Sequence, residues 1–163
     1  MKIELQNRLF AKYPDLFYQK NLDMTRTCMC WGVDTGDGWY NILNQMCTAI
    51  VAHQKHKKDL PVSFAQIKEK FGGLRAYFDG GDDYVEGVVD MAERMSYVTC
   101  ETCGAPGKER GTGWINTYCD ACNKEKIKHW AEVTNTIALR GRLMGLSSDV
   151  KAKKDLLEEN EEE

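Results

Sequence analysis

The stretch Cys100-Glu-Thr-Cys103-Gly-Ala-Pro-Gly107, with Cys119-Asp-Ala-Cys122 downstream, decides how this chain is organised. Two C-x-x-C pairs with fifteen residues between them are typical of a tetrahedral zinc site with four thiolate ligands. The two-residue gap lets both sulfurs of a pair reach one ion from a tight turn, and Gly104 can adopt the backbone angles that close that turn. We therefore predict a structural Zn²⁺ site at Cys100, Cys103, Cys119 and Cys122, because four thiolates leave no open position for a reacting water. Two disulfides, or four separate thiols, are the alternatives.

The composition fits one ordinary globular domain. The chain has 163 residues, of which 42% are hydrophobic, and it contains no apolar run near the roughly twenty residues of a membrane span. The N-terminus lacks the apolar core of a secretory signal, and the seven cysteines are an odd number. We therefore expect a reducing cytoplasm, with metal-bound thiols rather than a disulfide framework.

Charge is distributed unevenly along the chain. Residues 151–163 hold three Lys and six acidic residues, which accounts for the whole net charge of −3. The other 150 residues carry 19 basic and 19 acidic side chains. A neutral body disfavours a duplex-DNA binder that works mainly by neutralising phosphates, but it leaves room for a local basic pocket.

These features predict an α+β fold. We expect a single zinc-stabilised domain over residues 1–146, with a zinc ribbon at about 98–124 and a long C-terminal helix. The acidic tail over 147–163 has little apolar surface to bury, so we expect it to be mobile.

Apolar spacing predicts most of the first half of the domain. The first helical segment should break near Pro14, and a core helix with a stripe from Trp39 to Ile50 should follow Asp37, its expected N-cap. Ser63-x-x-Gln66 is typical of a capping box and predicts a short helix, which Gly72-Gly73 would end.

The second half shows both strand and helix patterns. Residues 74–78 alternate as a strand does. A helix over 84–98 should follow, with a buried stripe of Val85, Val88, Ala92 and Met95. Two short strands should lie between the cysteine pairs, and the last helix should begin after Cys122.

Six residues outside the cysteine pairs are ligand-binding candidates. Arg75 and Tyr77 should project from one strand face, where an Arg beside an aromatic can clamp a phosphate and stack a base. The same face can equally be solvated, with a surface ion pair. Asp34 lies in the Gly-rich stretch 28–40, which is either loop architecture or a ligand contact. The full set is Trp31, Asp34, Arg75, Tyr77, Arg110 and Trp114.

Several short motifs in this chain occur together in one known group of proteins. They are Cys30-Trp31-Gly32, Gly36-Asp37-Gly38-Trp39, Phe71-Gly72-Gly73-Leu74-Arg75, the C-x-x-C-Gly-x-Pro-Gly run and Gly113-Trp114. Over residues 24–122 the chain resembles small proteins encoded by tailed bacteriophages and prophages. The resemblance implies expression in an infected bacterium and an accessory role, either binding a host protein or interfering with host defence. It brings no catalytic residues with it.

We predict that the protein acts by binding. The favoured hypothesis is capture of a small anionic, nucleotide-like ligand, and the alternative is a module that binds a host protein. A carboxylate-dependent enzyme built on Asp34 and Asp37 is less favoured, because the sequence shows no nucleophile–base arrangement and no P-loop. Direct nucleic-acid binding through the ribbon is less favoured because the body is neutral. Whether the chain forms a homo-oligomer stays open.

Overall fold

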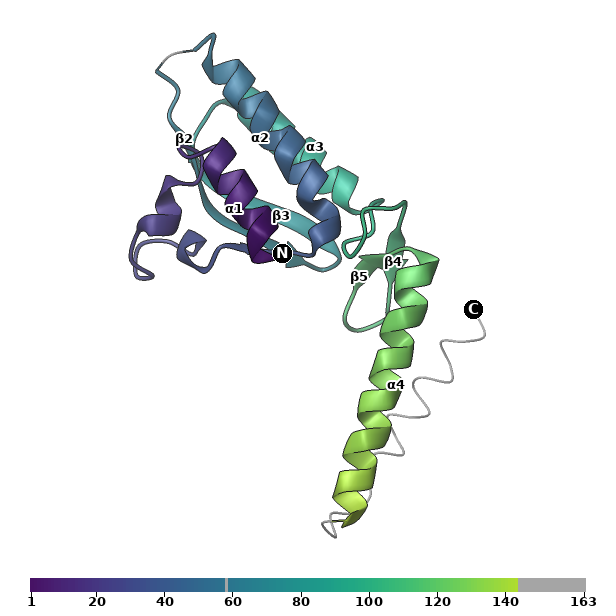
Figure 1. Ribbon diagram of the computed structural model, residues 1–163. Helices are drawn as coiled ribbons and strands as arrows, with labels where there is room; N and C mark the ends of the chain where they lie inside the picture. Colours follow the sequence, from purple (N-terminus) through teal and green to yellow (C-terminus); the bar gives the residue numbers. More distant parts are fainter. Residues whose placement is uncertain (58, 144–163) are drawn as a thin grey trace. The chain divides into compact units, whose positions relative to one another are not determined.

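The computed structural model describes residues 1–57 and 59–143 (Figure 1). The chain divides into two compact units, one from Met1 to Cys122 and one that begins at Asn123. The predicted acidic tail, 147–163, lies outside the described residues.

The α+β prediction is confirmed. The helix α1 ends two residues before Pro14, where the proline ring removes a backbone donor. In chain order the elements are α1 (Ile3–Lys12), η1 (Tyr18–Asn21), η2 (Met29–Trp31), β1 (Val33–Asp34), η3 (Asp37–Trp39), α2 (Tyr40–Gln54), β2 (Val62–Lys70), β3 (Gly73–Gly80), α3 (Asp83–Ser96), β4 (Lys108–Arg110), β5 (Asn116–Tyr118) and α4 (Asp120–Leu143).

A three-stranded sheet in the order β1-β2-β3 forms the centre of the first unit. β1 pairs with β2 in parallel, and β2 pairs with β3 antiparallel. Side chains of α3 cover the outer edge of β3: Ser96 Oγ accepts from the Leu74 N–H at 2.8 Å, and Glu93 accepts from the Ala76 N–H at 3.1 Å. These contacts satisfy backbone donors that an open edge would leave to another chain.

The segment after Pro61 is a strand, so the helix predicted at Ser63-x-x-Gln66 is wrong. A β-bulge between Phe64 and Gln66 places an extra residue on β2 relative to β3. The extra residue puts Phe64 and Ile67 on the same face at a spacing of three, which imitates helical periodicity. Both side chains are fully buried, so pairing with β3 and burial in the core outweigh the local capping signal.

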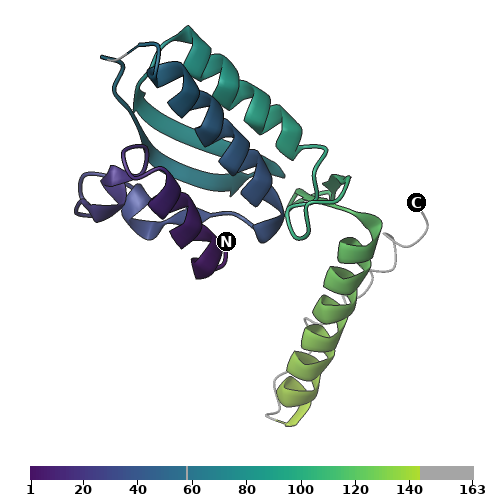
Figure 2. The same ribbon diagram turned by 45° about the horizontal axis from the view of Figure 1, so that its top comes forward.

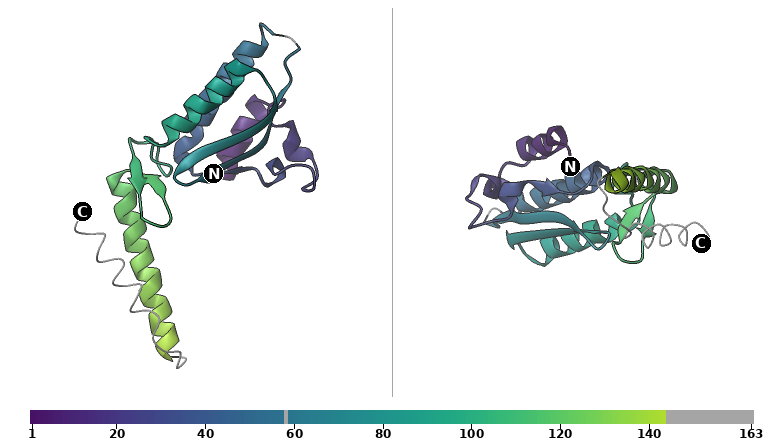
Figure 3. Two further views of the ribbon diagram at one scale, coloured as in Figure 1. Left: turned by 180° about the vertical axis from the view of Figure 1, so that it is seen from behind. Right: turned by 90° about the horizontal axis from the view of Figure 1, so that it is seen from below.

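Three helices share one hydrophobic core with the sheet. Leu9 of α1, Leu43 of α2 and Val85 of α3 are fully buried in the same cluster as Phe64 and Leu74. Figure 2 shows α2 and α3 side by side against the sheet, and the view from behind in Figure 3 (left) shows strands in front of α1. The predicted core stripe of α2, from Trp39 to Ile50, is confirmed.

The inward face of α3 differs from the prediction. Val85 and Ala92 are buried as expected, but Val89 and Ser96 are buried in place of Val88 and Met95. Met95 is 46% exposed. The helix turns Ser96 inward because its hydroxyl accepts the Leu74 N–H, a contact that apolar periodicity does not register.

The opposite face of the sheet carries polar and charged side chains. Alternation directs Gln66, Lys68 and Lys70 of β2, and Arg75 and Tyr77 of β3, away from the core. Each is half-buried or exposed. We call these five residues the open sheet face; they confirm that Arg75 and Tyr77 share a face.

The second unit contains most of α4. Trp130, Ile137 and Leu139 of this helix are each more than half exposed. Within residues 1–57 and 59–143, no helix combines the length and the apolarity that crossing a bilayer requires.

Candidate functional site

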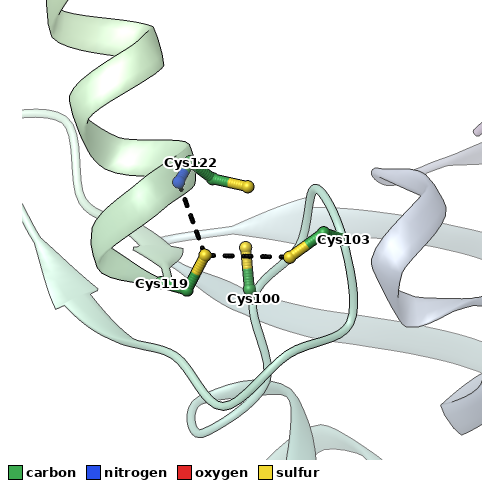
Figure 4. A group of neighbouring side chains, drawn as sticks. All are labelled: Cys100, Cys103, Cys119 and Cys122. Carbon is green, nitrogen blue, oxygen red and sulfur yellow. Dashed lines mark hydrogen bonds between the residues drawn. The ribbon is translucent and has the colours of Figure 1, made fainter.

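The four cysteines predicted as ligands lie together. Figure 4 shows Cys100 and Cys103 on one turn, Cys119 just before α4 and Cys122 on its first turn. Their sulfur atoms all lie within 4.8 Å of one another, and the Cys103 and Cys119 sulfurs are 3.7 Å apart. A tetrahedron of thiolates about 2.3 Å from a metal ion has sulfur–sulfur edges of about 3.8 Å. The arrangement fits a structural metal site. All four thiols are free, and a disulfide would need sulfurs about 2.05 Å apart.

The electrostatics of the cluster favour a bound cation. Burial disfavours the Cys100 thiolate, but the backbone N–H groups of Cys119, Cys103 and Thr102 outweigh burial and lower the Cys100 pKa to about 7. Burial and the neighbouring thiols raise the pKa of Cys122. Without a cation the cluster therefore favours the thiolate of Cys100 and disfavours those of Cys103 and Cys122, whereas a divalent metal would stabilise thiolate ligands in general.

The first cysteine turn is closed as predicted. Gly104 has a φ of 79°, and its N–H donates to the Cys100 carbonyl at 2.8 Å. We call residues 98–122, which carry this turn, β4, β5 and the second cysteine pair, the cysteine ribbon. β4 and β5 are the two short strands predicted between the cysteine pairs, and they pair antiparallel.

The Gly-rich stretch 36–39 docks on this turn. The Gly38 N–H donates to the Glu101 carbonyl at 2.7 Å, and the Gly36 N–H donates to the Glu101 carboxylate at 2.8 Å. Trp39 Nε1 donates to the Thr99 carbonyl at 2.8 Å. A Cβ at Gly38 would overlap the Cys100 carbonyl oxygen. The loop-architecture alternative therefore accounts for these glycines, because the two backbones approach too closely for a side chain.

Asp37 has a different role from the predicted N-cap. The N-cap position of α2 is Trp39, and no side chain caps it. The Asp37 carboxylate instead accepts the Lys2 N–H at 2.7 Å and lies 3.2 Å from the Lys2 ammonium. The Lys2 N–H lowers the pKa of Asp37. A short 3-10 turn, η3, precedes α2 and displaces Asp37 from the cap position.

The other half of the cysteine ribbon supports the β2–β3 hairpin. Thr117 Oγ1 donates to the Gly72 carbonyl in a buried hydrogen bond of 2.7 Å. The Thr117 carbonyl accepts the Glu101 N–H at 2.9 Å. The metal-site turn, β5 and the tip of the hairpin are therefore joined by consecutive hydrogen bonds.

Arg75 is held by residues of the same chain. Its guanidinium donates to the Tyr97 hydroxyl at 2.6 Å and lies 3.8 Å from the Glu93 carboxylate. The hydrogen bond to Tyr97 is the largest of the interactions that raise the pKa of Arg75. Tyr77 is 46% exposed, and the Lys68 ammonium lies 5.6 Å from the centre of its ring. The open sheet face thus presents an aromatic ring beside a positioned guanidinium and a lysine.

Trp31 and Asp34 line a separate pocket of about 420 Å³. Trp31 is 72% exposed. Asp34 lies on β1 opposite Lys68, so this pocket adjoins the open sheet face at the β1 edge.

Arg110 and Trp114 lie in the cysteine ribbon. Arg110 forms an ion pair with Asp120. Trp114 is 80% exposed and lines a pocket with Phe71, at the tip of the β2–β3 hairpin. The six predicted ligand residues therefore do not form one pocket: four lie on or beside the sheet, and two lie in the ribbon.

Sequence reasoning missed three residues that share these surfaces. Lys68 and Lys70 were included in the helix wrongly predicted at Ser63, so their position beside Arg75 was not foreseen. Phe71 falls at the end of the same predicted helix, and its side chain is 65% exposed. The Gly72-Gly73 pair was the available signal, because a glycine pair between two alternating segments also fits a hairpin turn.

Comparison with protein-family models, with curated proteins and with solved structures finds no match for this chain. The resemblance to phage-encoded proteins therefore stays a prediction.

Proposed function

We propose that this chain is a binding protein, in which the four clustered cysteines hold one structural Zn²⁺ and the open sheet face binds a small anionic, nucleotide-like ligand. Zinc is the proposed metal because four thiolates in a tetrahedral arrangement suit Zn²⁺ and give it no open coordination position. The metal supplies folding energy to the cysteine ribbon, and no chemical step is assigned to it.

One observation carries the ligand proposal: Lys68 and Arg75 are cross-strand partners beside the exposed ring of Tyr77. Like charges directly opposite each other on a sheet are unfavourable, and a bound anion would offset that repulsion. The Tyr77 ring offers a surface on which a base can stack. Tyr97 and Glu93 hold the Arg75 guanidinium in place, so less side-chain freedom would be lost on binding.

The resemblance to phage-encoded proteins supplies a setting for this activity. In the cytoplasm of an infected bacterium, a protein that sequesters a nucleotide signal would counter host defence. This setting is part of the proposal.

The alternative, a module that binds a host protein, is favoured by a different surface. A groove of about 540 Å³ lies between α2 and α3, and its lining is mostly apolar. Met91, Met95 and Tyr84 border it and are 59%, 46% and 48% exposed. Methionine-rich grooves between helices can accept an apolar helix of a partner.

Calorimetry of the metal-loaded protein against mononucleotides and cyclic dinucleotides tests the ligand proposal. We expect Lys68→Ala and Tyr77→Ala each to weaken binding by about tenfold, because each removes one contact to the ligand. Lys55→Ala and Tyr18→Ala are the matched controls, since each removes the same group from an exposed position of the first unit that is not part of the open sheet face. A folded, zinc-loaded protein that binds none of these nucleotides would overturn the ligand proposal and favour the groove.

A further inference from the structure

We infer that the binding surface continues beyond the open sheet face to a second aromatic site at the hairpin tip, and that its ligand is a short single-stranded oligonucleotide. We call Lys70, Phe71 and Trp114 the tip site. This inference rests on the proposed function and deepens it, because it names the class of anionic ligand that both sites bind together.

The tip site is a pocket between two loops. Its volume is about 190 Å³, and Phe71 and Trp114 line it with Lys70, Glu69, Gly113 and Ile115. Phe71 is 65% exposed and Trp114 is 80% exposed. Two large aromatic rings therefore lie in solvent around one pocket and beside one lysine, a combination that suits stacking of an unpaired base.

Neither the turn nor the core explains a phenylalanine at position 71. Phe71 has a φ of 54°, a left-handed conformation that bulky residues rarely adopt, and Gly72 follows with a φ of 76°. Two-residue hairpin turns of this kind favour Asn-Gly, and an exposed ring contributes little to the core. The turn requires a backbone conformation that is unfavourable for phenylalanine. The presence of phenylalanine here therefore indicates a role for its ring at the surface.

The structure also holds the tip in position. The Gly72 N–H donates to the Glu69 carboxylate at 2.6 Å, and the Gly72 carbonyl accepts from Thr117 at 2.7 Å. The cysteine ribbon thus fixes the turn that carries Phe71. A ring held in this way loses little freedom when a base stacks on it.

Lysines connect the tip site to Tyr77. The Lys70 ammonium lies 5.2 Å from the centre of the Phe71 ring, and the Lys68 ammonium lies 5.6 Å from that of Tyr77. Both lysines project from the same face of β2, so an aromatic–lysine pair occurs twice along it. Phe71 lies five positions after Gln66, the cross-strand partner of Tyr77, and at about 3.3 Å per residue these five steps span about 17 Å. That length suits about three nucleotides, with bases on the rings and phosphates near the lysines.

The same features favour single strands over a duplex or an apolar peptide. Bases in a duplex are stacked on each other and cannot lie on protein rings. The balanced charge of residues 1–150, with 19 basic and 19 acidic side chains, also provides no excess of cations to neutralise a duplex backbone. An apolar peptide would give Lys68 and Lys70 no anionic partner.

Binding of thymidine monophosphate, a thymidine trinucleotide and a thymidine hexanucleotide to the zinc-loaded full chain tests the inference. We expect the trinucleotide to bind at least about tenfold more tightly than the mononucleotide. Phe71→Asn and Trp114→Ala should each remove most of that gain and leave mononucleotide binding unchanged. Asn suits the left-handed turn, so Phe71→Asn should fold. Trp130→Ala, which removes an equally large exposed ring from α4, should change neither affinity.

Each outcome separates the two proposals. If the mononucleotide binds and the trinucleotide binds no more tightly, the inference is wrong and the proposed function stands. The inference also fails if the tip variants keep the wild-type gain, or if a duplex of the same length binds as well as the single strand. If neither ligand binds, the proposed function fails with it.

Discussion

The docking of the Gly-rich loop on the metal-site turn predicts a large effect of one methyl group at Gly38. A Cβ there would overlap the Cys100 carbonyl oxygen and the Gly104 nitrogen and would lie 2.7 Å from the Glu101 carbonyl oxygen. All three are backbone atoms of the turn that carries Cys100 and Cys103. They cannot move aside as a flexible side chain would, so Gly38→Ala must displace the loop from the turn.

The cost follows from the contacts that are lost. Overpacking against fixed atoms typically costs about 1–3 kcal/mol, and loss of the hydrogen bond from the Gly38 N–H to Glu101 adds about 1 kcal/mol. We therefore expect Gly38→Ala to lower the free energy of unfolding by about 2–4 kcal/mol, or the Tm by roughly 5–15 °C. Metal release to a chelating dye should also be faster, since Cys100 and Cys103 lie on the displaced turn.

Gly87→Ala provides a matched control. Gly87 lies in α3, and among the described residues no heavy atom other than its chain neighbours and the adjacent backbone of the same helix lies within 4 Å of the Cβ that the substitution would add. Alanine is favoured over glycine inside a helix by about 0.5–1 kcal/mol, so this variant should be slightly more stable than the wild type. Thermal unfolding of both variants measures this difference in stability. If Gly38→Ala unfolds with the wild type and retains its metal equally well, the loop does not hold the ribbon as argued.

Three further predictions test the metal, Arg75 and the hairpin turn. Metal analysis of the native protein should give about one zinc per chain, and Cys103→Ser should lose the metal and unfold the cysteine ribbon; a metal-free protein with two disulfides would contradict this. Arg75→Ala should lower the free energy of unfolding by about 1–2 kcal/mol, because the Arg75 side chain, in a half-exposed position, donates a hydrogen bond to Tyr97 and lies near Glu93. Urea unfolding measures this free energy, and an unchanged value would mean that solvent screens these contacts. Phe71→Asn should raise the Tm by a few degrees, about 1 kcal/mol, because Asn tolerates the left-handed turn; a lower Tm in differential scanning calorimetry would show that the Phe71 ring supports the fold.

The parts of this fold that the sequence predicts well depend on local spacing. The C-x-x-C pairs specify their own turns, so all four cysteines of the cluster could be named in advance. The stripe from Trp39 to Ile50 is also local, since helical periodicity alone places those residues on one face. The fold class follows from elements of this kind.

The parts that it does not predict depend on contacts between distant residues. The bulge between Phe64 and Gln66 gives β2 a spacing of three between buried residues. Only the pairing of β2 with β3 distinguishes this segment from a helix. That single error also concealed Lys68 and Lys70, because residues assigned to a helix are not compared with a neighbouring strand. Gly38 could be recognised as a special position, but Glu101, its partner, lies more than sixty residues away.

The hydrogen bonds of the first unit suggest why a binding protein would need a structural metal. The cysteine cluster lies on the turn at Cys100, the Glu101 N–H of that turn donates to the Thr117 carbonyl, and Thr117 Oγ1 donates to the Gly72 carbonyl at the hairpin tip. Phe71 and Trp114 therefore lie on two loops that the same ribbon supports, whereas Tyr77 lies on a strand that the hydrophobic core supports directly. In the proposed function, metal coordination would add support to these two loops, because metal binding is coupled to folding. Loss of the metal should thus loosen the tip site while the open sheet face stays intact. The metal would then control the length of oligonucleotide that the protein prefers, and not whether the open sheet face binds a nucleotide.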